Sequence, residues 1–198
     1  MTMHDHPASA GEHAGHAHDM PTSGNALTSM ALSATLHCLT GCAIGEVTGM
    51  VIGTALGLSN VATTVLAIAL AFLFGYSLTS LPLLRGGLAL AAVIPIAFAS
   101  DTLSIATMEV VDNLIVVLVP GAMDAGLEDV LFWGSLAFAL PVAGAFALPV
   151  NRWLLARGKG HAAVHKTGIH GGLSPRLVGT AAALLFVFGL IVLIVDAG

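Results

Sequence analysis

Charged side chains are scarce in this chain of 198 residues, where Lys, Arg, Asp and Glu together make up 9%. A soluble domain carries charge on about a quarter of its residues, because its surface must stay hydrated. The scarcity therefore excludes an ordinary soluble domain. Only six residues are Lys or Arg, and they form no basic patch, so nucleic acid is not an expected partner.

Cysteine is also scarce, and the residue arrangements of common enzymes are missing. The two cysteines, Cys38 and Cys42, lie in one apolar run. Side chains at this spacing on a helix stand side by side, so a disulfide between them is not expected. No Ser–His–Asp arrangement and no phosphate-binding loop emerges, and we expect that the protein is not an enzyme.

Apolar residues, in contrast, make up 57% of the chain, and the mean hydropathy is +0.95. They fall in runs of roughly 20 residues or more, the length at which a helix crosses a bilayer. The short alternating segments of a transmembrane β-barrel are not seen. We predict an all-α integral membrane helical bundle over residues 27–198, with about five transmembrane helices, at 28–58, 61–84, 87–119, 128–151 and 175–196.

The first 26 residues contain no Lys or Arg, so they are not a secretory signal, which would begin with basic residues. Their polar, Gly- and Ala-rich composition predicts a disordered, His-rich tail.

The basic residues predict the orientation. Arg85 follows the second span, and the others lie between the end of the fourth span and the start of the fifth: Arg152, Arg157, Lys159, Lys166 and Arg176. With five spans, both connections fall on one side, which the positive-inside rule places in the cytoplasm together with the N-terminus. We therefore expect a multi-pass protein of the bacterial inner membrane, with the lipid bilayer as its surroundings. Trp133 and Trp153 are separated by about 30 Å of helix, which suits one ring at each interface.

The third apolar segment is long for a single span and contains Pro95. We expect a crossing that ends near Met108, followed by an interfacial or re-entrant stretch up to the Pro120–Gly121 turn. Irregular backbone at that depth must be buried in protein or line water.

The first span carries two parallel rows of residues at every fourth position. One row consists of glycines, and its expected role is close helix packing: Gly41, Gly45, Gly49, Gly53 and Gly57. The second row lies one residue further round the helix and carries sulfur and oxygen atoms: Cys38, Cys42, Glu46, Met50 and Thr54. Because side chains at i and i+4 share a face, these groups form one line along the helix.

This second row predicts an intramembrane metal site. Thiolates and thioethers suit Cu(I), and added imidazole and carboxylate groups also suit Zn(II), so the expected cofactor is copper or zinc. The candidate ligands come from the first and third spans: His37, Cys38, Cys42, Glu46, Met50, Met108 and Glu109. Asp101 and Asp112 share a face with the last two and are candidates for an ion or proton pathway. An intramembrane carboxylate such as Glu46 indicates function, although buried cysteine and methionine also serve as plain packing residues.

Histidines gather on the side predicted to be cytoplasmic. Eight of them are candidates for metal capture, in the tail and in the connection between the fourth and fifth spans: His4, His6, His13, His16, His18, His161, His165 and His170. Short His-rich tracts bind borderline divalent metals. The alternative is a flexible polar tail without a role in metal binding.

Short sequence matches are consistent with a parallel duplication of the first two hairpins. Residues 81–85 (LPLLR) resemble residues 148–152 (LPVNR), and Glu46-Val47 has a counterpart in Glu109-Val110. Transporters often place their site at such a repeat interface. On this interpretation Glu46 and Glu109 face each other.

Several of these motifs resemble one bacterial family of polytopic membrane proteins, known as domain of unknown function 4396. The resemblance covers roughly residues 30–196 and is carried by the row from His37 to Met50, Asp112–Asn113, the turn at 120–124 and the segment at 151–161. It implies a compact helical membrane fold without an established activity, and a loose association with copper handling. The chain lacks the His-x-x-x-x-Asp-His pattern of nickel–cobalt permeases and the soluble machinery of a P-type ATPase.

The leading hypothesis is a small membrane protein that binds and translocates a transition-metal cation, with Cu(I) as first candidate and Zn, Ni or Co as others. The alternative is a non-transporting scaffold or assembly partner, which would use its glycine row to dock another membrane protein or a second copy of the chain. A third hypothesis, thiol exchange between Cys38 and Cys42, is disfavoured by their helical spacing. The metal, the direction of movement, the coupling ion and the oligomeric state stay open.

Overall fold

The structure, a computed structural model, describes residues 23–168 and 175–196. All regular structure within these ranges is helical, which confirms the predicted all-α class. The elements are α1 (Gly24–Leu56), α2 (Asn60–Arg85), α3 (Leu90–Leu118), α4 (Val130–Ala156), α5 (Ala162–His165) and α6 (Pro175–Asp196). Most of the predicted tail lies outside the described residues, and α1 begins at Gly24, slightly before the predicted boundary.

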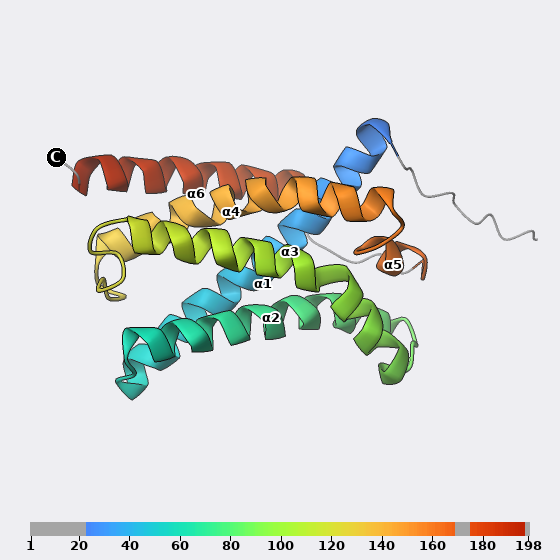
Figure 1. Cartoon of the computed structure of the whole chain (residues 1–198), viewed down its shortest axis with the longest axis horizontal. Helices are drawn as coiled ribbons and strands as arrows, with labels where there is room; N and C mark the ends of the chain where they lie inside the picture. The colour runs from blue at the N-terminus through green and yellow to red at the C-terminus, as the bar shows by residue number, and fades with distance from the viewer. Residues whose placement is uncertain (1–22, 169–174, 197–198) are drawn as a thin grey trace, which may run out of the picture.

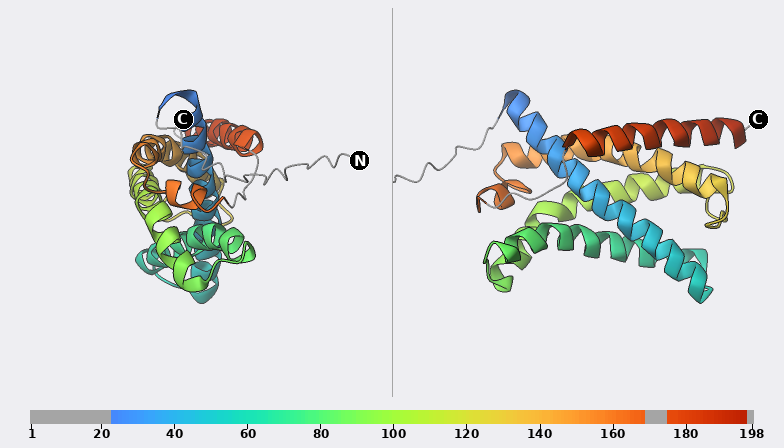
Figure 2. Two further views of the ribbon diagram at one scale, coloured as in Figure 1. Left: turned by 90° about the vertical axis from the view of Figure 1, so that its right-hand side faces the viewer. Right: turned by 180° about the vertical axis from the view of Figure 1, so that it is seen from behind.

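The long helices form an elongated bundle. In Figure 1, α6, α4, α3 and α2 run roughly along the long axis, and Figure 2 shows α1 crossing them obliquely from behind. The α1–α2 turn and the α3–α4 connection lie at one end, called here the acidic end because it carries Asp124, Glu128 and Asp129. The α2–α3 turn and α5 lie at the other, called the basic end because it carries Arg85, Arg157, Lys159 and Lys166.

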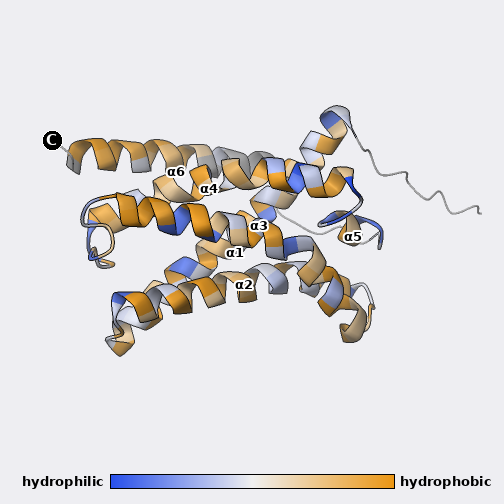
Figure 3. Ribbon diagram, viewed as in Figure 1, coloured by the Kyte–Doolittle hydropathy of each residue, from blue (hydrophilic) through white to orange (hydrophobic). Residues whose placement is uncertain are grey.

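The bundle is that of a membrane protein. The helices α1, α2, α3 and α4 are each long and apolar enough to cross a bilayer. Apolar residues dominate all the long helices, and polar residues gather in the connections (Figure 3). Large apolar side chains such as Val65, Leu90 and Val117 remain about 60% exposed on the outside of the bundle, where lipid rather than water is their natural neighbour.

The residues of the fifth predicted span form the helix α6, of 22 residues, and its crossing of the membrane stays a prediction. It packs along α4, where the rings of Phe138 and Phe186 stack with their centroids 5.4 Å apart. Gly134 of α4 also allows a close approach of Val192 of α6. The two helices therefore form one layer of the bundle.

The third segment differs from its prediction. The helix α3 is continuous from Leu90 to Leu118, so the predicted re-entrant stretch after Met108 is wrong. Pro95 lies inside this helix, and the first part of α3 bends away from the rest in Figure 1, as helices commonly do at proline. A bent or tilted helix accommodates excess length without leaving the bilayer.

The glycine row of α1 packs against α2. A Cβ added at Gly41 would lie 2.7 Å from Cα of Gly75, and one added at Gly49 would lie 2.5 Å from Cα of Ala67. Gly45 and Gly53 approach Ala71 and Thr63 in the same way. The predicted packing role is thus confirmed for these four glycines, and their partner is a helix of the same chain.

Gly57 does not share this role. It adopts a left-handed conformation with φ of 63° at the end of α1, and no atom of the described residues lies within 4 Å of its added Cβ. Within that part of the chain it packs against no helix, and its role is to end α1, because glycine reaches positive φ at little cost.

Candidate metal centre and ion cavity

A column of buried polar and sulfur-containing side chains runs between α1 and α3. On α1 the row one residue beyond the glycines carries Cys38, Cys42 and Glu46, which are buried. On α3 the buried face carries Asp101, Ser104, Met108, Glu109 and Asp112. Helical spacing places each set on one face, and the fold brings the two predicted rows together.

At the basic end the column holds Cys38, Asp101 and His161, called here the loop-end cluster. The Sγ of Cys38 lies 3.9 Å from Oδ1 of Asp101, and Nδ1 of His161 lies 3.1 Å from the same oxygen. One donor atom from each residue lies within 4.8 Å of the others. The side chain of Asp101 is completely buried and that of His161 is 11% exposed, so this cluster is shielded from water.

Polar residues around the loop-end cluster fix its supporting helices. The Nδ2 of Asn151 on α4 donates to Oγ1 of Thr35 and to Oγ of Ser104, both at 2.9 Å. His37 bonds Oγ1 of Thr79 on α2 at 2.9 Å, and its ring meets that of His161 edge to face, with centroids 5.3 Å apart. The four helices α1, α2, α3 and α4 are thereby tied together beside the cluster.

In the middle of the column, Cys42 and Met108 form a sulfur pair. Both are almost fully buried, and Sγ of Cys42 lies 4.0 Å from Sδ of Met108. Both cysteines are free thiols. The pair lies between the loop-end cluster and the carboxylates that follow, because Cys38 precedes Cys42 by one turn of α1 and Glu46 follows by one turn.

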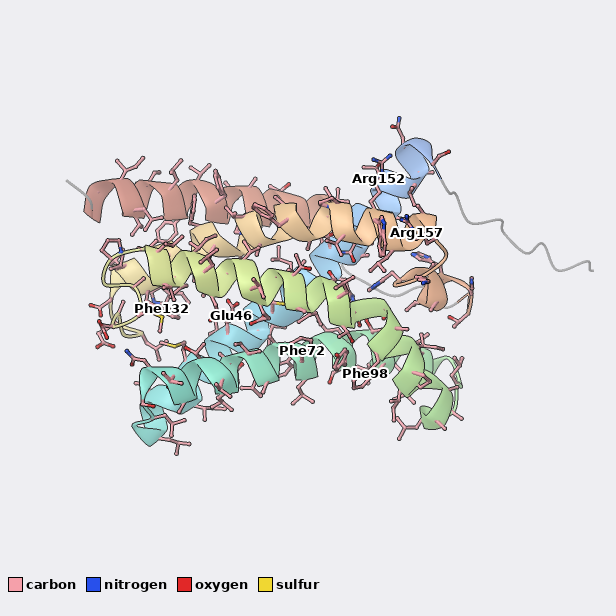
Figure 4. All side chains as sticks on the ribbon, viewed as in Figure 1. Glu46, Phe72, Phe98, Phe132, Arg152 and Arg157 are labelled. Carbon is pink, nitrogen blue, oxygen red and sulfur yellow. The ribbon has the colours of Figure 1, made fainter. Side chains whose placement is uncertain are left out.

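Toward the acidic end the column opens into a cavity of about 190 Å³. Three carboxyl groups line it and are called here the inner carboxylates: Glu46 of α1 and Glu109 and Asp112 of α3. Figure 4 shows Glu46 on the part of α1 that passes behind α3, and Phe132, which also lines the cavity, nearer the acidic end. The volume far exceeds the roughly 10–15 Å³ that one water needs.

Five oxygens of the inner carboxylates are buried without a hydrogen bond of good geometry. Both carboxyl oxygens of Glu46, both of Glu109 and Oδ1 of Asp112 are buried and accept no hydrogen bond. Glu46 interacts electrostatically with Asp112 and Glu109. Carboxylates in such surroundings are stabilised by a proton, by a cation or by water in the cavity.

The predicted metal ligands thus lie at different points along the column and do not surround one position. Met50 lines the cavity, whereas Cys38 lies in the loop-end cluster with Asp101, which was predicted only for a pathway. His161, predicted only to capture metal outside the bundle, also belongs to this cluster. His165 lies one turn further, and its N–H donates to the carbonyl of His161. The other histidines predicted to capture metal lie outside the described residues: His4, His6, His13, His16, His18 and His170.

Sequence reasoning missed Thr35, Thr79, Ser104 and Asn151. A buried asparagine in an apolar span is a visible signal, because an amide in lipid needs a partner. The pairing of Asn151 with Thr35 and Ser104, in contrast, joins segments far apart in the chain and requires the fold.

The fold and its buried column define a polytopic helical membrane protein that holds ionisable groups inside its bundle. Residues 28–160 match the family described as Domain of unknown function (DUF4396), and the chain belongs to this family. The matched range includes nearly all of the column and ends next to His161. Neither the curated proteins nor the solved structures provide a match.

Proposed function

We propose that this protein binds a transition-metal cation between α1 and α3 and passes it across the membrane, with Cu(I) as the first candidate. The observation that carries the proposal is the set of buried, unpartnered inner carboxylates next to a buried sulfur pair. The two groups lie on consecutive turns of α1 and α3. Together they supply charge compensation and soft ligands along one path.

A cationic partner would compensate the charge of the inner carboxylates. An ionised side chain at mid-bilayer costs a few kcal/mol or more when it is unpaired. Within the described residues, no Lys or Arg donates a hydrogen bond to the five buried oxygens of these carboxylates. A mobile cation, or protons that exchange for it, removes this cost, and such exchange would couple metal movement to proton movement.

The sulfur atoms favour Cu(I) as the cargo. A thiolate and a thioether are the soft ligands that select this ion. Beyond the sulfur pair, two more thioethers, Met50 and Met123, line the cavity toward the acidic end. Successive weak sites of this kind let an ion enter and leave, which conduction requires.

The orientation follows from the charges at the two ends. The basic end carries Arg85, Arg157, Lys159 and Lys166, and the positive-inside rule assigns it to the cytoplasm. The N-terminus precedes α1 at this end, so the His-rich tail would be cytoplasmic and would concentrate metal at the loop-end cluster. The cavity would then open toward the outside of the bacterial inner membrane.

The contacts of the glycine row do not favour the scaffold alternative. The four glycines that were to dock another protein are covered by α2. The thiol-exchange alternative also has no support, since Cys38 and Cys42 contact different partners: Asp101 in one case and Met108 in the other.

Elemental analysis tests the proposal. The five histidines before residue 23 are first replaced by glutamine, so that the tail binds no metal, and the purified chain is loaded with Cu(I) under reducing conditions. We expect about one copper per chain in the sulfur pair, and its loss in the double variant Cys42→Ala/Met108→Leu. Met30→Leu, which alters a methionine outside the column, is the matched control. Equal copper content in the double variant and the control would overturn the proposal.

A further inference from the structure

We propose that the loop-end cluster is a second metal site, which takes a divalent transition-metal ion of the zinc class and fastens the α4–α6 connection to the end of the bundle. Its ligands are Sγ of Cys38, the carboxylate of Asp101 and Nδ1 of His161. The inference goes beyond the proposed function, because this cluster lies apart from the cavity and shares no residue with the sulfur pair or the inner carboxylates.

The spacing of the donor atoms fits such an ion. Zinc bonds of about 2.0–2.3 Å in a tetrahedron place neighbouring ligand atoms about 3.3–3.8 Å apart. In the loop-end cluster the nitrogen–oxygen separation is 3.1 Å and the sulfur–oxygen separation is 3.9 Å. Small side-chain movements therefore bring all three atoms to bonding distance of one centre.

Two of the donor atoms lack the partners that burial normally demands. The Oδ2 of Asp101 and Nδ1 of His161 are buried and make no hydrogen bond. The 3.1 Å separation of Nδ1 from Oδ1 suits an ion pair, but the geometry is not that of a hydrogen bond. Leaving such atoms unpaired is unfavourable, and one metal ion bound by the Asp101 carboxylate and by Nδ1 of His161 would give both groups a partner.

The charges favour a divalent ion. Cys38 as thiolate and Asp101 as carboxylate carry two negative charges, while His161 binds metal as the neutral ring. A divalent ion neutralises this set, whereas Cu(I) would leave one uncompensated charge in a medium of low polarity. Mixed sulfur, nitrogen and oxygen donors also suit zinc better than copper(I). Binding releases the thiol proton of Cys38 to the buffer.

The surroundings hold the ligands in place. His37, fixed by Thr79, packs its ring edge against that of His161, and Ser104, one turn after Asp101, is fixed by Asn151. Outer groups of this kind orient metal ligands in known sites. The three protein ligands leave a fourth position for water or for a passing ligand.

The backbone after α4 folds back so that His161 lies against the end of the bundle. Gly158 and Gly160 adopt positive φ of 64° and 61°, which turns the chain back toward α4. A Cβ at Gly160 would lie 3.0 Å from Cβ of Leu154, so the backbone passes close to the helix. Ala162, which follows His161, is completely buried against Leu155. A metal bond to His161 would add a second anchor beside this contact.

Metal binding at His161 should change the rate of trypsin cleavage nearby. Lys159 and Lys166 lie on either side of His161 in the sequence and are exposed. Both are trypsin sites. Cleavage requires the local chain to open, and a ligand that binds only the closed form lowers the fraction of open chains by a factor of 1 plus its concentration over its Kd. Bound metal should therefore protect both sites.

The experiment uses the full chain, with the five tail histidines replaced by glutamine, and Co(II) as a spectroscopic probe. We expect thiolate-to-cobalt charge transfer and tetrahedral absorption with about one Co(II) per chain. Both should be lost in Cys38→Ser, Asp101→Asn and His161→Asn. Zinc should slow trypsin cleavage at Lys159 and Lys166 at least tenfold, except in these variants. His161→Cys, which keeps a donor atom, should retain the charge transfer.

Cys42→Ala/Met108→Leu separates this inference from the proposed function, because it should lose copper and keep the cobalt spectrum. A cobalt spectrum and zinc protection that persist in His161→Asn would overturn the second site and leave the proposed function standing. An unchanged trypsin pattern without metal shows that each variant is folded.

Discussion

The Sγ of Cys42 on α1 lies 4.0 Å from Sδ of Met108 on α3, and this contact joins the two halves of the buried column. Toward the basic end, one turn away, lie Cys38 and its cluster. Toward the acidic end, one turn in the other direction, lies Glu46 at the cavity. The α1–α3 interface is therefore a continuous line of candidate metal and proton ligands.

The glycine row should be intolerant of larger side chains. In Gly45→Leu the new side chain would meet the backbone of Ala71, so α1 and α2 must separate. We expect a loss of at least about 1–3 kcal/mol in the free energy of unfolding, the usual cost of overpacking, measured by denaturation in detergent. Val51→Leu on the exposed side of α1 is the control. Equal stability of the two variants would contradict the assigned packing.

The Asn151 bridge should be measurable as a coupling energy. Asn151 donates to both Thr35 and Ser104 in the buried bundle. In a double-mutant cycle with Asn151→Ala and Ser104→Ala, we expect a coupling of roughly 0.6–1.7 kcal/mol, the range of hydrogen bonds between membrane helices. Unfolding in detergent gives the four required stabilities. Strictly additive effects would show that this bond contributes nothing.

The sequence predicted the helices and the faces of α1 and α3 well, because apolar length and four-residue spacing are local signals. It predicted neither the continuity of α3 nor the course of the connection after α4. Asp101 and His161 are separated by 60 positions, and only tertiary packing brings them together. We expected one metal site from the sequence because spacing shows only which residues share a helix face. How those residues are grouped depends on the helix that packs against that face, which the sequence does not show.

Removing the charge of Glu46 should reduce metal passage without lowering the stability of the fold. In Glu46→Gln a buried, unpartnered carboxyl group becomes an uncharged amide of the same shape. We expect the free energy of unfolding to stay equal or to rise by about 1 kcal/mol, because burying an unpaired charge opposes folding. Metal passage should fall at least tenfold. Glu128→Gln, at an exposed position, should alter neither. A marked loss of stability in Glu46→Gln would assign the carboxylate to structure.

The orientation can be tested with single cysteines in the Cys38→Ser/Cys42→Ser background. The exposed positions Glu128 and Lys159 lie at opposite ends of the bundle. A membrane-impermeant maleimide added to spheroplasts should label Glu128→Cys directly, and Lys159→Cys only after permeabilisation. The reverse pattern would place the basic end outside and contradict the positive-inside assignment.

The central claim is that the column conducts a metal cation, and flux into proteoliposomes tests it most directly. Liposomes containing a luminal Cu(I)-binding dye are prepared with the protein, with Cys42→Ala/Met108→Leu, or with Met30→Leu, and Cu(I) is added outside under reducing conditions. The account predicts rapid dye response with the protein and with Met30→Leu, and a response at the level of empty liposomes with the double variant. Equal flux through the double variant and the protein would contradict it.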